Sequence, residues 1–171
     1  MQQGIEHVGF LSRHPEQTRH FGMRLGEAAT SGDVLLLRGP FGAGKTTLVQ
    51  GIALGLGVEG RVTSPSFILI NEYVGRLPLR HVDLFRLEAL DTETEQAIES
   101  CESAGGVTVI EWPELLPSDL REGALRIDMQ ILGDEDRSLM VHTEGSRWKG
   151  ADLASMMESA LRVRPGEEAG A

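Results

Sequence analysis

The segment LLLRGPFGAGKTTLVQGIALGLG, residues 35–57, constrains the fold more than any other part of the chain. It begins inside the apolar run DVLLLRG, residues 33–39, and passes through a glycine-rich stretch. It then enters a segment in which Leu48, Ile52 and Leu56 recur at helical spacing until Gly57. The pattern predicts a buried strand, a loop and a helix in direct succession, as in α/β proteins.

The loop itself has the spacing of a phosphate-binding loop. Gly39 is followed by four residues and then by Gly44, Lys45 and Thr46. Glycines let backbone N–H groups converge on a β-phosphate, and the helix N-terminus adds positive potential. Lys45 would reach the β- and γ-oxygens, and the Thr46 hydroxyl would ligate magnesium. The alternative, a glycine-rich helix start with a solvated lysine, fits the flanking strand and helix less well, so we expect a nucleoside triphosphate site.

A phosphate-loop site needs a carboxylate at a neighbouring strand end, to hold the magnesium shell or to polarise water. Two residues qualify. Glu111 ends the apolar strand GVTVIEW, and Asp83 ends the alternating strand LRHVDLF. Glu111 could instead be a helix-start carboxylate before Pro113, and Asp83 a turn carboxylate. The sequence does not rank the two.

Other polar segments are less specific. TSPSF, residues 63–67, is either a loop that senses the γ-phosphate through its hydroxyls or a proline turn that opens a strand. We interpret His81 as structural and Cys101 as a packed or idle thiol. GDED, residues 133–136, predicts only a hairpin turn.

Charge and cysteine content exclude several classes of function. Sixteen basic and twenty-six acidic side chains give a net charge of −10, which offers no general attraction to DNA, RNA or anionic membranes. The single cysteine excludes an internal disulfide and a cysteine zinc cluster. No apolar run approaches the roughly 20 residues of a membrane helix. We therefore expect a cytoplasmic location and contact with nucleic acid only through a partner.

The remaining patterns predict one domain, residues 1–162, followed by a flexible tail, 163–171, that has too little apolar surface to fold. The tail has the sequence VRPGEEAGA. Further strands are expected at 7–11, 66–74, 77–85, 106–112, 125–131 and 138–145, and further helices at 15–29, 91–101 and 153–161. The last two strands form a hairpin, so the sheet should be mixed.

Four segments together, GPFGAGKTT, TSPSF, HVDLFRL and VIEWPELLP, resemble the bacterial TsaE (YjeE) family in order and spacing. The resemblance runs from about Ser12 to the final helix. It implies a P-loop NTPase-like α/β fold, a three-layer sandwich whose mixed sheet is mostly parallel at its core and carries antiparallel hairpins. It also implies a small ATPase that binds ATP and Mg²⁺. Members of the family work with the proteins TsaB and TsaD to make threonylcarbamoyladenosine on tRNAs that read codons beginning with A.

Carried over by position, the resemblance implies specific roles. Thr46 and Glu111 would hold magnesium, Asp83 would be a catalytic or water-polarising carboxylate, and Lys45 would contribute to catalysis. The phosphate cradle would consist of Phe41, Gly42, Ala43, Gly44, Lys45, Thr46 and Thr47.

The resemblance also implies nucleotide contacts near Pro15 and at Gly133. The chain departs from the family at Ser66, where threonine is common, and at Phe85, where tyrosine is common. Ser66 keeps a hydroxyl, whereas Phe85 loses one.

Two other functions compete with a partner-driven ATPase. A small-molecule kinase could use the same loop, but kinases shield the phosphoryl group with a lid of closely spaced arginines. Here no basic residue lies between Arg86 and Arg121. A nucleotide-dependent binding module without turnover is disfavoured by the presence of both Asp83 and Glu111.

Overall fold

The computed structural model describes residues 7–65 and 69–169, and its strands form one seven-stranded sheet with the order β1-β7-β6-β2-β5-β4-β3. The strands are β1 (His7–Ser12), β2 (Asp33–Arg38), β3 (Ile70–Tyr73), β4 (Leu79–Asp83), β5 (Val107–Glu111), β6 (Leu125–Ile131) and β7 (Arg137–His142). The helices are α1 (Pro15–Ala28), α2 (Lys45–Gly55), α3 (Thr92–Ser103) and α4 (Leu153–Leu161).

The sheet is parallel at its centre and antiparallel at both sides. β2 pairs in parallel with β5 and β6, and β4 pairs in parallel with β5. β3 joins β4, β7 joins β6 and β1 joins β7, each in antiparallel orientation. The mixed sheet predicted from the sequence is therefore confirmed. The carboxyl ends of β2, β4 and β5 share one edge of the sheet, the edge at which α/β proteins bind ligands.

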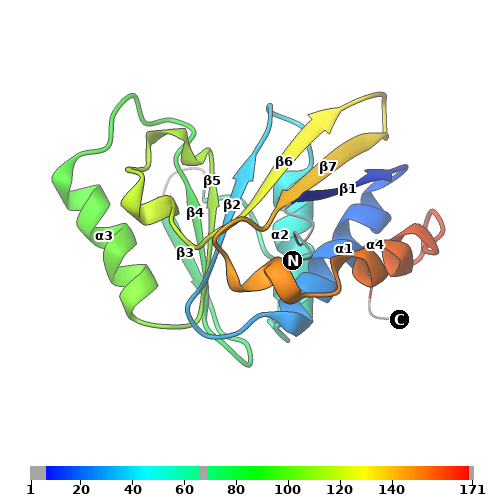
Figure 1. Ribbon diagram of the computed structural model, residues 1–171, viewed down its shortest axis with the longest axis horizontal. Coiled ribbons are helices and arrows are strands. Elements are labelled where there is room, and N and C mark those ends of the chain that lie inside the picture. The colour runs from blue at the N-terminus through cyan, green and yellow to red at the C-terminus, as the bar shows by residue number, and fades with distance from the viewer. Residues whose placement is uncertain (1–6, 66–68, 170–171) are drawn as a thin grey trace, which may run out of the picture.

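Helices cover both faces of the sheet, which gives three layers (Figure 1). α1, α2 and α4 pack on one face through a core that includes Phe21 and Ile52. α3 packs on the opposite face through Ile98. β2 contributes to both cores, because Leu35 and Leu37 face α2 whereas Leu36 belongs to the other core. This explains its unbroken apolar run.

β4 departs from the alternating pattern that we expected. Its first four residues, Leu79, Arg80, His81 and Val82, are all buried. The strand lies between β3 and β5 and is covered on both faces, so its polar residues need partners inside the protein. Arg80 donates to the carbonyl oxygens of Gly105 and Cys101.

Glycines let α1 and α2 approach closely. A Cβ atom at Gly22 or Gly26 would collide with backbone of α2, and one at Gly51 or Gly55 would collide with backbone of α1. The two helices therefore present backbone to each other, and this contact holds the helix that follows the phosphate loop against the rest of the domain.

Other expectations meet the structure in part. β3 begins only at Ile70, and part of its predicted range, 66–68, lies outside the described residues. Residues 163–169 form no helix or strand, although the Gly166 N–H donates to Glu16 on α1. Within the described ranges, none of the helices has the length and apolar character required to cross a bilayer. The domain boundary and the flexibility of the tail stay predictions.

Candidate nucleotide site

The loop between β2 and α2 has a backbone that only glycine adopts readily. Gly44, the residue before α2, is left-handed with φ of 94°, and Gly42 has φ of 80°. A Cβ atom at Gly39 would press on the carbonyl oxygen of Met129, 2.5 Å away. The glycines that define the sequence pattern are therefore required by the geometry of the loop.

Lys45 is buried at the start of α2 and points back along the loop. Its Nζ donates to the carbonyl oxygens of Gly39, at 2.6 Å, and Pro40, at 2.9 Å. The same atom lies 4.1 Å from the centroid of the Trp112 ring, a cation–π distance. Burial lowers the pKa of Lys45, and the nearby carboxylates, Glu111 first, oppose that shift. The ammonium is thus held in place before any phosphate arrives.

The two candidate carboxylates lie side by side. Asp83 and Glu111 are the last residues of β4 and β5, and they are register partners in the parallel pair. The Thr46 hydroxyl donates to Glu111 Oε1 at 3.3 Å. Asp83 accepts from the Ser64 hydroxyl at 2.7 Å and from the Phe85 N–H at 3.0 Å. Both carboxylates are therefore oriented by bonds within the protein.

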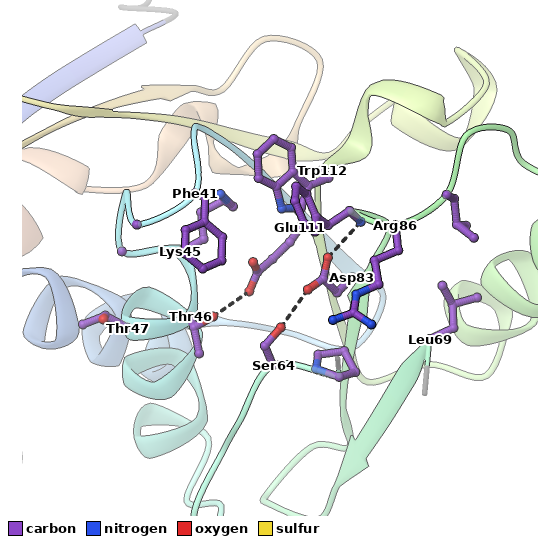
Figure 2. A pocket seen from close by; sticks show the side chains of 15 residues that line it. Phe41, Lys45, Thr46, Thr47, Ser64, Leu69, Asp83, Arg86, Glu111 and Trp112 are labelled. Carbon is purple, nitrogen blue, oxygen red and sulfur yellow. Dashed lines mark hydrogen bonds between the residues drawn. The ribbon is translucent and has the colours of Figure 1, made fainter. Parts of the chain in front are cut away.

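A cavity of about 660 Å³ joins these groups (Figure 2). It is lined by the phosphate loop, by the two strand ends and by Ser64 and Pro65 from the TSPSF segment; Ser66 and Phe67 lie outside the described residues. Of the predicted site residues, the structure places the following at the cavity: Phe41, Gly42, Gly44, Lys45, Thr46, Thr47, Asp83 and Glu111. Ala43 lies in the same loop but packs into the core.

Pro15 and Gly133 are not among the described residues that line the cavity. They belong to a neighbouring region, in which Arg13 forms an ion pair with Asp136. Arg137, the first residue of β7, connects this region to the phosphate loop. Its guanidinium donates to the carbonyl oxygen of Gly42 at 3.1 Å and to that of Gly133 at 2.9 Å. The role of Pro15 and Gly133 in nucleotide binding stays a prediction.

From the sequence we interpret His81 as a structural residue, but its side chain also lies at the site. Its Nε2 lies 2.8 Å from Glu111 Oε1, and both side chains are buried. The signal available in the sequence was its spacing of two from Asp83, which places both side chains on one face of β4. Arg137 had no such signal, because its contacts join segments far apart in the chain.

An aromatic cluster borders the cavity. Trp112 is the one non-glycine residue of the described chain with a positive φ, 58°. This left-handed backbone, which costs roughly 1 kcal/mol, turns the chain sharply after Glu111. The Trp112 ring contacts Phe85 at 4.9 Å between centroids, and Phe85 contacts the exposed ring of Phe41 at 6.3 Å. Phe85 thus interacts through its ring with Trp112 and Phe41, and these contacts do not need the hydroxyl that a tyrosine would carry.

The donors present at the cavity suit magnesium. A threonine hydroxyl and a carboxylate are hard oxygen ligands, and magnesium takes most of its remaining ligands from water and phosphate. Within residues 7–65 and 69–169, no group of three or more His, Cys, Asp or Glu side chains is placed to hold a metal. The hydroxyl of Thr46 and the carboxylate of Glu111 fit a magnesium ion whose remaining ligands are phosphate and water.

The fold and the site define a P-loop nucleotide-binding protein of the α/β class: a parallel central strand runs into a glycine loop and a helix, and carboxylates end two neighbouring strands. Residues 12–139 match the model of the family described as threonylcarbamoyl adenosine biosynthesis protein TsaE. The chain belongs to the TsaE family.

Individual relatives agree with this assignment. A Treponema pallidum protein named tRNA threonylcarbamoyladenosine biosynthesis protein TsaE is 39% identical over 131 residues, which are 77% of this chain and 97% of the relative. The Bacillus subtilis protein of the same name is 36% identical over 137 residues, 80% of this chain and 85% of the relative. The crystal structure of Bacillus subtilis YdiB superposes with a TM-score of 0.68 at 29% identity, covering 91% of this chain and 95% of that chain.

Proposed function

We propose that this chain is an ATPase of tRNA threonylcarbamoyladenosine biosynthesis that binds ATP with Mg²⁺ and drives the working cycle of the proteins TsaB and TsaD. Family membership supports the pathway. One observation supports the chemistry: Thr46 donates to Glu111, and Glu111 pairs in register with Asp83, all within the cavity that Lys45 enters.

Each side chain has a role in the proposal. The loop N–H groups and Lys45 bind the β- and γ-phosphates. Thr46 and Glu111 hold magnesium, which when bound neutralises charge on the phosphate oxygens. Asp83, whose two oxygens accept from Ser64 and Phe85, orients the water that attacks the γ-phosphorus. The bond from that phosphorus to the β–γ bridging oxygen breaks, and ADP and phosphate leave.

We further propose that hydrolysis is slow until the partners dock. Transfer of a phosphoryl group needs positive charge beyond a loop lysine and magnesium, and one added arginine can raise the rate by about 10³- to 10⁵-fold. Arg86, which lines the cavity three residues after Asp83, is the nearest arginine in the chain's own site. Docking would supply a further residue or complete the site with the hydroxyls of the TSPSF segment. The net charge of −10 fits a subunit that leaves tRNA binding to others in the cytoplasm.

Steady-state release of phosphate tests the proposal. The chain alone should be slow, and addition of TsaB and TsaD should accelerate it. A rate of about 10 per second for the isolated chain, an ordinary turnover, that the partners leave unchanged would refute the dependence on partners. Appearance of a phosphorylated metabolite would indicate a kinase instead, and ATP binding without turnover under all conditions would indicate a binding module.

A further inference from the structure

His81 contacts the site through Glu111. The ring is fully buried on β4, and its register partner on β5 is Val109, two residues before Glu111. Side chains two apart on a strand share a face, so His81 and Glu111 both point toward α2. Thr46, on the first turn of α2, reaches the same carboxylate.

The bond between His81 and Glu111 has a defined direction. A carboxylate oxygen accepts and does not donate, so the ring donates from Nε2 at 2.8 Å. Thr46 donates to the same oxygen, Oε1. Two donors on one oxygen hold Oε1 in place and so restrict how the carboxylate lines the cavity.

The other ring nitrogen shows that packing is not the reason for a histidine here. Among the described residues, Nδ1 of His81 is buried without a hydrogen-bond partner. Burial of an unpaired polar atom costs stability, and an apolar residue of similar size would avoid that cost. The Nε2 bond to Glu111 is the gain that offsets it.

We propose that His81 is a positioning residue: it holds the Glu111 carboxylate in the orientation that binds the magnesium of a nucleotide. This rests on the function proposed above. Partners that orient a metal ligand typically account for about 10- to 100-fold in metal affinity. His81 should therefore set the magnesium concentration that the site requires, and leave binding of metal-free nucleotide unchanged.

The test is a magnesium titration of ATP binding, followed by calorimetry, with parallel binding measurements in EDTA. His81→Leu should need about 10- to 100-fold more magnesium, whereas His81→Gln, whose amide can donate from a similar position, should stay near wild type. Val82→Ala is the matched control, because it shortens the side chain of the neighbouring residue of β4, which lies on the opposite face of the sheet. It should lower thermal stability without changing the magnesium requirement.

Nitrogen-15 NMR of labelled histidines in the metal-free, nucleotide-free chain gives a second readout. It should show a His81 Nε2–H signal protected from exchange with water, and that signal should shift in Glu111→Gln. If His81→Leu does not fold, His81→Asn replaces it, since its amide is too short to reach Oε1.

The outcomes separate the two proposals. A wild-type chain that binds no ATP refutes the proposed function, while the NMR signal still tests the contact between His81 and Glu111. A chain that binds ATP normally, and whose folded His81→Leu variant has the wild-type magnesium requirement, refutes the positioning role. A His81→Gln variant as impaired as His81→Leu also refutes it, because the role would then be packing.

Discussion

Replacing Lys45 by methionine should weaken ATP binding without destabilising the fold. In the free chain the ammonium already has two carbonyl acceptors, on Gly39 and Pro40, and the face of Trp112. Phosphate would replace neutral acceptors with charged ones, and a hydrogen bond to a charged group contributes about 1.5–3 kcal/mol. Loss of this hydrogen bond should raise the dissociation constant of ATP roughly 10- to 150-fold.

The folding stability of the Lys45→Met variant should not fall, in contrast to its affinity for ATP. Burial lowers the pKa of Lys45, so its charge costs stability at every pH below the folded-state pKa, and the cost disappears as the pH rises toward the unfolded value. Methionine keeps most of the buried stem and removes that cost. Water can reach the exposed Pro40 once the ammonium is gone. The melting temperature at pH 7 should therefore not fall.

Calorimetry with Mg-ATP and thermal unfolding of the same samples check both parts. Lys149→Met is the matched control, since Lys149 is the other lysine of the chain and lies in the short helix Arg147–Gly150 before α4. It should bind ATP as the wild type does. Unchanged affinity in Lys45→Met would refute the phosphate-loop assignment, and a large fall in melting temperature would refute the reasoning about burial.

Three further predictions concern the same site. Glu111→Gln should impair magnesium-dependent hydrolysis much more than it impairs ATP binding in EDTA, because it keeps size and removes charge; if Asp83→Asn alone abolishes the magnesium dependence in kinetic assays, the two roles are reversed. Trp112 fluorescence should change on addition of ATP, since the ring lies against Lys45, and a flat titration alongside binding seen by calorimetry would contradict this placement. Arg137→Met should weaken ATP binding roughly fivefold, which corresponds to about 1 kcal/mol of lost preorganisation. It should also speed hydrogen exchange of the amides in the phosphate loop. If those amides stay as protected from exchange as in the wild type, Arg137 does not stabilise the loop.

Much of the site is contained in short stretches of sequence. The spacing from Gly39 to Thr46 determines a loop, because positive φ at Gly42 and Gly44 is a local backbone preference. The apolar run before Glu111 likewise predicts a buried strand and the alternating run before Asp83 predicts a strand, and both carboxylates do end their strands. The mixed sheet followed from the hairpin pattern at 125–145.

Only the tertiary structure decided which of these pieces meet. β4 pairs with β5 in the register that sets Asp83 beside Glu111, and a shift by one residue would turn one set of side chains to the other face. The same pairing brings His81 to Glu111, which is why its spacing alone gave no role. Arg137 reaches Gly42, 95 residues away in the chain, because β7 pairs with β6 and β6 pairs with β2, the strand that leads into the phosphate loop. Strand order and register depend on packing between distant segments, and no local preference specifies them.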